Sequence, residues 1–201
     1  GHALAARGGV AVDFSRMDKV LRVSAEDMDC TVQPGVTRTG LNEALKATGL
    51  MFPVDPGADA TLGGMAACRA SGTTAVRYGT MREQVLGLQV VLASGEVIRT
   101  GSRARKSASG YDLTGLFVGS EGTLGLITEL TLRLHGQPEA ISTATCAFPS
   151  DAAAIDTVIA CIQHGLSPAR IEYMDAESVA AVNARDGLGL PEAPHLLVEF
   201  H

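Results

Sequence analysis

The pattern of hydrophobic and polar positions predicts several short strands along the first two thirds of the chain. Apolar runs alternate with turn signals such as Pro34-Gly35 and Ser94-Gly95. The predicted strands are residues 9–14, two strands within 20–32, the two arms of a hairpin at 85–93 and 96–100, and residues 124–134. This part of the chain is therefore expected to form a sheet with few helices.

Helical spacing appears first over residues 37–48, where Gly49 supplies the end of the helix. A short helix is also expected over residues 112–118. Beyond residues 136–138 the pattern of predicted elements changes, because strands and helices now alternate in βαβαβ order. The elements expected there are strands 143–148, 169–174 and 195–200, a helix capped by Ser150, and a short helix over 176–184. The sequence thus predicts a second α+β unit that begins near residue 140.

Composition narrows the class of protein. Among 201 residues, 46% are hydrophobic and 19% are charged, which is the balance of a soluble globular protein. The formal net charge of −6 argues against a nucleic-acid partner, because binding phosphates requires a basic surface. No run approaches the length of a membrane span. The four cysteines form no C-x-x-C pair and are expected to be buried free thiols, and the five histidines show no zinc-ligand spacing.

The range 51–72 is dense in glycine and proline and has no strong periodicity. Within it, Gly63 and Gly64 follow a turn at Pro56-Gly57. Paired glycines let backbone N–H groups face a ligand, because no Cβ stands in the way. An ordinary surface loop would explain the same residues, since a lone glycine pair is a weak signal. Residue chemistry alone leaves both interpretations open.

A second glycine-rich range, residues 119–128, places glycines at three-residue spacing before a predicted strand. It matches neither a dinucleotide-binding fingerprint nor a P-loop, so it is either a ligand-binding turn or a structural bend. The basic run at residues 103–106 is best interpreted as a solvated loop. The sequence shows no nucleophile elbow around Ser71 or Ser120 and no glycosidase-type carboxylate pair.

Several runs taken together resemble one family. They are DPG (55–57), ATLGGMAA (60–67), ASG (70–72), AVRYGTMR (75–82), RKSASGYDLT (105–114) and LFVGSEGTLG (116–125). In this order they closely resemble the FAD-linked oxidases with a flavin domain of the vanillyl-alcohol-oxidase or PCMH type. Within that family the nearest match is to cytochrome-dependent D-lactate dehydrogenases and the flavin subunit of glycolate oxidase. The resemblance covers essentially the whole chain.

The resemblance implies an α+β fold. Residues 1–138 would be the later part of a PCMH-type FAD-binding domain, and residues 139–201 the beginning of a ferredoxin-like cap domain. It also implies that the surface in contact with the flavin is made largely of backbone groups. The residues carried over are Pro56, Gly57, Thr61, Gly63, Gly64, Met65, Ser71, Gly72, Tyr78, Gly79, Glu121, Gly122, Gly125 and Ile127. Glu121, Gly122, Gly125 and Ile127 would hold the ribityl and adenine end, Ile127 through its main chain.

The chain departs from the family pattern at both ends. The family's pyrophosphate-binding loop would precede Gly1, and its catalytic and metal-binding residues would follow His201. We therefore expect no catalytic residue and no metal ligand here. We expect FAD to bind weakly or not at all to this chain alone, because losing three charge-assisted hydrogen bonds costs roughly 4–9 kcal/mol. Open sheet edges would favour self-association into a homo-oligomer.

The expected activity of the parent protein is hydride transfer from a small 2-hydroxy acid, such as D-lactate or glycolate, to FAD. A quinone or a cytochrome would be the electron acceptor, and the location would be the cytoplasm or the periphery of the inner membrane. Two alternatives remain open. One is a non-redox flavin synthase on the same scaffold, and the other is a non-catalytic fragment or accessory flavin-binding subunit.

Overall fold

The computed structural model describes residue 5 and residues 7–201, and its chain divides into two compact units. The first unit contains Gly1–Phe52, Gly57–Ala70 and Met81–Gly136. The second contains Pro53–Pro56, Ser71–Thr80 and Gln137–His201. Both units therefore take residues from the glycine-rich range 51–72.

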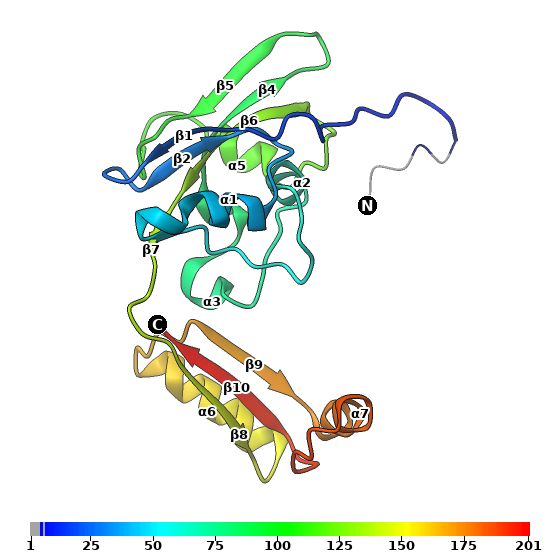
Figure 1. The fold of residues 1–201 in the computed structure, drawn as a ribbon, viewed down its shortest axis with the longest axis vertical. Coiled ribbons are helices and arrows are strands. Elements are labelled where there is room, and N and C mark those ends of the chain that lie inside the picture. The colour runs from blue at the N-terminus through cyan, green and yellow to red at the C-terminus, as the bar shows by residue number, and fades with distance from the viewer. Residues whose placement is uncertain (1–4, 6) are drawn as a thin grey trace. The chain divides into compact units, whose positions relative to one another are not determined.

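The first unit is built on a five-stranded sheet in the order β1-β2-β6-β4-β5, with antiparallel neighbours (Figure 1). Its strands are β1 (Val20–Ser24), β2 (Asp29–Val32), β4 (Val85–Val91), β5 (Val97–Gly101) and β6 (Leu126–Arg133). The predicted hairpin and the strand that follows it are confirmed. The central strand β6 buries every second side chain near its end, and Leu130 and Leu132 have no exposed surface.

The strand predicted over residues 9–14 is wrong. The chain is irregular there, and Val10 and Val12 are 90% and 55% exposed. Apolar alternation stabilises a strand only where a neighbour pairs with it and covers one face. Within the described residues no strand pairs with residues 9–14.

Short helices and a two-stranded ladder complete the first unit. They are α1 (Arg38–Leu45), the 3₁₀ turn η1 (Lys46–Thr48), β3 (Leu50–Met51), α2 (Leu62–Ala67), α4 (Met81–Gln84), α5 (Leu113–Phe117) and β7 (His135–Gly136). The predicted first helix is confirmed: the Thr37 hydroxyl accepts from the Gly40 amide at 3.0 Å, and Gly49 ends the turn at φ 71°. Helix α2 lies in the range whose pattern predicted no helix.

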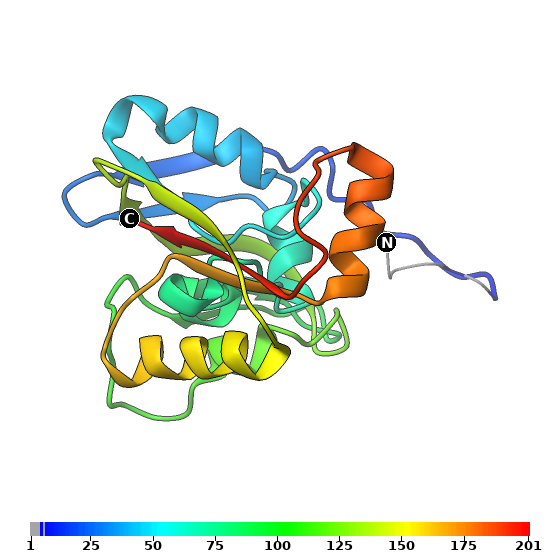
Figure 2. The ribbon, with the colours of Figure 1, turned by 90° about the horizontal axis from the view of Figure 1, so that it is seen from below.

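The second unit carries a three-stranded antiparallel sheet in the order β8-β10-β9. Its elements are α3 (Ala75–Tyr78), β8 (Ser142–Ala147), α6 (Asp151–Gln163), β9 (Arg170–Met174), α7 (Ala176–Asp186) and β10 (His195–Phe200). The predicted βαβαβ order is confirmed. Figure 2 shows α6 in yellow and α7 in orange as two separate helices of this unit. Ser150 and Asp175 cap their first turns by accepting from backbone amides.

The four free cysteines differ in how far they are exposed to solvent. Cys30 on β2 is fully buried, whereas Cys68 and Cys146 are exposed. The expectation of four buried thiols is therefore wrong for at least these two. Cys146 lies on β8, whose six residues are all exposed, because this strand lies at the edge of a small sheet.

Candidate functional site

The two glycine-rich segments that the sequence singled out meet inside the first unit. Helix α2 begins at Thr61, whose hydroxyl accepts from the Gly64 amide at 3.3 Å. The loop after α5 then comes back to the end of α2. There the Gly119 amide donates to the Ala66 carbonyl and the Glu121 amide to the Ala67 carbonyl, both at 2.9 Å. Residues about 50 positions apart thus form one backbone surface at the C-terminal end of α2.

The loop of residues 119–122 has an unusual backbone. Gly119, Glu121 and Gly122 have φ values of 93°, 50° and 78°. Glutamate in this left-handed region costs about 1–3 kcal/mol, which is a feature that clusters at ligand sites. The space in front of Gly122 is open, since a Cβ there would meet no atom within 4 Å.

Ser120 adds a second indication of a ligand at this loop. Its hydroxyl oxygen is buried, and no hydrogen-bond partner for it exists among the described residues. A buried polar group without a partner costs about 1–3 kcal/mol, so it needs an explanation such as a bound polar molecule. The loop therefore fits a polar ligand.

The structure corrects the reason for several of the predicted glycines. A Cβ on Gly63 would lie 2.4 Å from the Pro34 Cβ, and one on Gly125 would lie 2.6 Å from a Val90 methyl. These glycines are required by packing inside the protein. The N–H groups that were expected to face a flavin are also partly used: the amides of Gly63, Gly64, Met65, Glu121 and Gly79 all donate within the protein. Met65 moreover buries its side chain in the core.

At Ile127, strand β6 is paired with a neighbouring strand on one side only among the described residues. Strand β6 pairs with β4 along Ile127, but β2 pairs with β6 only from Leu130 to Arg133. The Ile127 side chain is 8% exposed and belongs to the core. The prediction that Ile127 acts through its main chain is compatible with this geometry.

The other predicted residues are divided between the units. Gly57 is an exposed residue of the first unit, and Pro56, Ser71, Gly72, Tyr78 and Gly79 belong to the second. A Cβ on Gly72 would lie 2.2 Å from an Asp55 carboxylate oxygen, so this glycine allows the chain to pass close to Asp55. Gly79 ends α3 at φ 81°.

Asp55 organises the turn before α3. Burial alone would raise the pKa of Asp55, but hydrogen bonds from Thr74 and Thr73 and the charge of Arg170 outweigh it and hold that pKa below its usual range. The Thr73 hydroxyl donates at 2.8 Å and the Thr74 amide at 3.0 Å. Asp55 is therefore a structural anion in the second unit.

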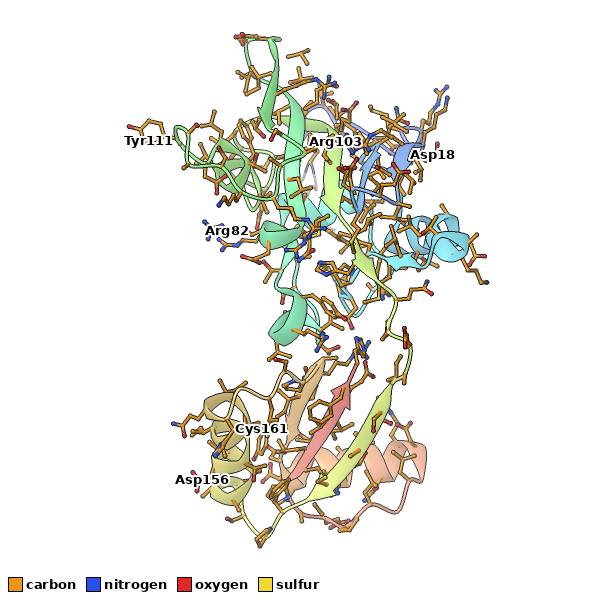
Figure 3. The ribbon with its side chains drawn as sticks, turned by 90° about the vertical axis from the view of Figure 1, so that its left-hand side faces the viewer. Asp18, Arg82, Arg103, Tyr111, Asp156 and Cys161 are labelled. Atoms are coloured by element: carbon orange, nitrogen blue, oxygen red, sulfur yellow. The ribbon has the colours of Figure 1, made fainter. Side chains whose placement is uncertain are left out.

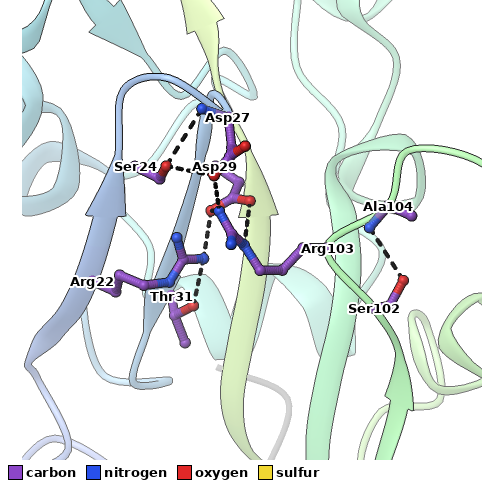
Figure 4. A network of polar contacts seen from close by, with 8 residues as sticks. All are labelled: Arg22, Ser24, Asp27, Asp29, Thr31, Ser102, Arg103 and Ala104. Carbon is purple, nitrogen blue, oxygen red and sulfur yellow. Dashed lines mark hydrogen bonds and ion pairs between the residues drawn. The ribbon is translucent and has the colours of Figure 1, made fainter.

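A second buried carboxylate, Asp29, lies at the centre of an ionic network in the first unit (Figure 4). It is 1% exposed and contacts the guanidinium groups of Arg22 and Arg103, with Arg103 Nε donating at 2.8 Å. Arg103 also pairs with Asp27, whose pKa is held low by hydrogen bonds from Ser24 and Arg103. Arg103 is exposed, as the prediction of a solvated basic loop requires, and its ion pairs with Asp27 and Asp29 are what that prediction lacked.

A wide groove of about 680 Å³ also lies in the first unit. Its charged lining residues include Arg82, Arg105, Lys106 and Asp112, and none of the predicted flavin residues lines it. Arg82 and Tyr111, both labelled in Figure 3, line this groove, and Tyr111 is 94% exposed. Since Arg82 and Asp112 approach to 3.8 Å and charges of both signs line the groove, it carries no clear ligand chemistry.

The described residues contain neither a cluster of metal-ligating side chains nor a helix that could span a membrane. No group of three His, Cys, Asp or Glu side chains in that part of the chain is arranged to hold a metal ion. None of its helices has the length and apolar character needed to cross a membrane.

Comparison with known proteins identifies the class. Residues 1–101 match the FAD binding domain family, and residues 137–201 match the C-terminal domain of FAD linked oxidases. The chain belongs to this family of FAD-linked oxidoreductases, and FAD is the cofactor of the family. The expected α+β fold with a PCMH-type flavin domain is confirmed. The buried Ser120 hydroxyl and the open loop around Gly122 fit such a polar cofactor.

Several similar proteins have names that specify an activity. The chain is 54% identical over 200 residues to a probable mitochondrial D-lactate dehydrogenase of Danio rerio, covering 98% of this chain and 40% of that protein. It is 52% identical to a mitochondrial cytochrome D-lactate dehydrogenase of Arabidopsis thaliana, covering 100% and 35%. It is 38% identical to the glycolate oxidase subunit GlcD of Bacillus subtilis, covering 96% and 42%. The chain thus spans about two fifths of the length of these relatives.

A solved structure supports the fold. An alkyldihydroxyacetonephosphate synthase structure superposes with a TM-score of 0.78 at 25% identity, covering 94% of this chain and 37% of that one. The predicted resemblance to hydroxy-acid oxidoreductases is therefore confirmed, and a flavin-linked synthase, the function left open as an alternative, is a more distant structural neighbour.

Proposed function

We propose that this chain supplies part of the FAD-binding surface of a dehydrogenase that oxidises a small 2-hydroxy acid. D-lactate is the first candidate substrate, because relatives at 54% and 52% identity are named as D-lactate dehydrogenases. Glycolate is the second, from the glycolate oxidase subunit at 38% identity. A cytochrome or a quinone would accept the electrons, and the cytochrome is favoured by the names of the Arabidopsis and Saccharomyces relatives.

The observation that carries the cofactor part of the proposal is the Ser120 hydroxyl, which is buried without a partner in a strained loop. The bound cofactor would supply the acceptor for the substrate hydride. The chain's own contribution is to bind and orient it. Ser120 would donate or accept a hydrogen bond, the residues around Gly122 would leave room for the ligand, and the unpaired side of β6 at Ile127 would offer main-chain groups.

The fourteen residues predicted from the family resemblance remain our proposed contacts with FAD. Within this set, the engaged amides at Gly63, Gly64, Met65, Glu121 and Gly79 would contact the cofactor through atoms other than N–H. The division into a flavin domain at residues 1–138 and a cap-domain segment at 139–201 is likewise proposed. We propose no catalytic residue in this chain.

The cofactor proposal is tested by titrating the purified chain with FAD and following flavin fluorescence and visible absorbance. Ser120→Ala is expected to weaken FAD binding by about two- to tenfold, because one hydrogen bond contributes about 0.5–1.5 kcal/mol. It should leave the free energy of unfolding of the flavin-free chain unchanged or slightly raised, since the hydroxyl has no partner there. The matched control is Ser107→Ala, an exposed serine outside the proposed site.

Two results would overturn parts of this proposal separately. Equal FAD affinities of wild type and Ser120→Ala would remove Ser120 from the site. Weak binding or none is the result expected of this chain alone, and tight binding, with a dissociation constant in the micromolar range or below, would refute that expectation. The substrate is tested by reduction of bound flavin with D-lactate, L-lactate and glycolate, and if the gene encodes a longer protein, with that protein. Reduction by none of the three would refute the hydroxy-acid assignment while leaving FAD binding intact.

A non-redox synthase is the second candidate function, and the structural match to alkyldihydroxyacetonephosphate synthase favours it. It predicts that no hydroxy acid reduces the bound flavin. The higher sequence identity to dehydrogenases makes this the weaker candidate. A non-catalytic accessory subunit remains the third.

A further inference from the structure

Three side chains of the second unit form a line of hydrogen bonds that the cofactor proposal does not use. The hydroxyl of Tyr78, at the end of α3, lies 2.8 Å from Nδ1 of His201. The other ring nitrogen of His201, Nε2, lies 2.7 Å from a carboxylate oxygen of Glu199 at the end of β10. The side chains of His201 and Glu199 are only 7% and 17% exposed. Water therefore competes weakly for these contacts.

Fixed charges surround this line. Arg170 on β9 lies 3.3 Å from the same Glu199 oxygen and 3.2 Å from an Asp55 oxygen. The guanidinium of Arg77 lies 5.6 Å from the centre of the Tyr78 ring and donates to the Ser167 carbonyl. Arginine stays protonated in proteins, whereas an imidazole has both a neutral and a protonated form, so His201 is the member of this group whose hydrogen bonds can be rearranged.

The carboxylate of Glu199 determines which way the hydrogen bonds run. An ionised carboxylate can only accept, so the His201 Nε2 must carry a hydrogen. In neutral imidazole the other nitrogen, Nδ1, is then an acceptor. The Tyr78 hydroxyl therefore donates its hydrogen to His201. When His201 takes up a second proton, Nδ1 becomes a donor, and the Tyr78 oxygen must accept instead.

We propose that Glu199 and His201 are positioning residues for Tyr78: they hold its hydroxyl as a donor to His201 when the histidine is neutral and reverse this hydrogen bond when it is protonated. This inference rests on the proposed function in one respect. Tyr78 and Gly79 are among the residues proposed to contact FAD, so the state of His201 would regulate cofactor binding. Because one hydrogen bond is redirected, the FAD dissociation constant should change by about two- to tenfold across the protonation of His201.

The first arm of the test needs no cofactor. Nitrogen NMR of protein labelled with ¹⁵N-histidine reports the tautomer and protonation of each of the five histidines, and His201→Asn identifies the His201 signals. We expect Nε2–H in the neutral form, and a shift in the pH at which His201 is protonated in both Glu199→Gln and Tyr78→Phe. The control Tyr173→Phe removes the hydrogen bond of another tyrosine in the same unit, which donates to Asp151 at 2.5 Å, and should leave His201 unchanged. An Nδ1–H tautomer, or no response to Tyr78→Phe, would overturn the arrangement.

The second arm is an FAD titration at several pH values. Wild type and Tyr173→Phe should show the pH-dependent affinity, with a midpoint that coincides with His201 protonation in the NMR experiment. Tyr78→Phe should abolish the pH dependence. His201→Asn keeps an acceptor near Nδ1 without a titrating ring, so it should bind FAD as tightly as wild type does at high pH and at every pH.

The outcomes separate this inference from the proposed function. Identical pH profiles of wild type and Tyr78→Phe would overturn the regulatory role even if FAD binds well. If FAD does not bind wild type at any pH, the regulatory role of His201 in this chain fails. The NMR arm then decides the hydrogen-bond arrangement alone.

Discussion

In the first unit the buried carboxylate Asp29 contacts two arginines, whereas in the second unit Glu199 contacts one arginine and a histidine. Both networks hold segments that are distant in sequence, with Arg103 lying 74 residues from Asp29 and Tyr78 lying 123 residues from His201. Arginine cannot lose its proton in a protein, so the first network keeps its charges over the whole physiological range. The second contains the imidazole of His201, and an imidazole has a neutral and a protonated form with different hydrogen bonds. The first is suited to permanent support and the second to a response to pH.

The two networks also differ in how much buried apolar surface surrounds them. The five-stranded sheet of the first unit buries a continuous set of aliphatic side chains, among them Val32, Leu88, Leu130 and Leu132. In the second unit, by contrast, every residue of β8 is exposed, and α6 exposes Ile155, Ile159 and Ile162. We therefore expect changes in the first unit to have the larger effect on stability and changes in the second to alter its pH dependence.

The largest effect is expected from Asp29→Ala. It leaves two guanidinium groups without their shared carboxylate, one of them only 34% exposed. We expect a loss of about 2–4 kcal/mol in the free energy of unfolding, measured by urea denaturation at neutral pH. The matched control is Asp27→Ala, which removes an exposed partner of Arg103 and should cost much less, because solvent screens an exposed pair. Equal losses in the two variants would show that burial does not distinguish these carboxylates.

A somewhat smaller effect is expected from Gly63→Ala in helix α2. The new Cβ would lie 2.4 Å from the Pro34 Cβ and 2.9 Å from the Pro34 carbonyl oxygen, so the helix must shift. Overpacking of this kind costs about 1–3 kcal/mol. Gly57→Ala is the control, because its Cβ would enter open space and its φ lies outside the left-handed region. If thermal denaturation finds the same midpoint for Gly63→Ala and wild type, the packing of α2 against Pro34 is not as close as described.

In the second unit, Asp55 should make the free energy of unfolding depend on pH in the acid range. The pKa of Asp55 lies below its usual value, so its contribution is fully present above the ordinary aspartate range and is lost as the pH falls through the folded-state pKa. Asp55→Asn should lower stability at neutral pH by about 1–2 kcal/mol, since the Thr73 and Thr74 hydrogen bonds weaken. The variant should also lose less stability than wild type on acidification below about pH 4. Denaturation curves at several pH values check both statements, and parallel curves for the two proteins would contradict them.

The sequence predicts those parts of the fold whose signals are local. The helix over residues 37–48 has a threonine cap and a glycine end, and the hairpin at residues 85–100 has a tight turn, so both were predictable. Helix α2 was not, because a short helix with two glycines depends on Thr61 and on packing against Pro34. The strand expected over residues 9–14 fails for the opposite reason, since its pattern has no pairing partner among the described residues.

The candidate site was predictable only in part. Its glycine-rich segments are visible in the sequence, and their meeting at the end of α2 is a tertiary result. Ser120 gave no signal because a serine in a glycine-rich turn is ordinary, and only the burial of its hydroxyl singles it out. The ion pair between Arg103 and Asp29 joins positions 74 residues apart, and local charge patterning predicts the solvated loop but not this distant partner.

The smallest change concerns the reactivity of one thiol next to Asp29. Burial, followed by the charge of Asp29, raises the pKa of Cys30 to about 12. The thiolate is the reactive form, so Cys30 should resist a thiol reagent at neutral pH while the exposed Cys68 and Cys146 react. Labelling followed by peptide mass spectrometry measures each site. Cys30 should become accessible in Asp29→Ala and remain protected in Asp55→Asn, because the first variant opens the sheet that covers it and the second acts in the other unit. Equal labelling of Cys30 in both variants would mean that the two units lose structure together, and the contrast between a permanent and a titratable network would then not extend to their stability.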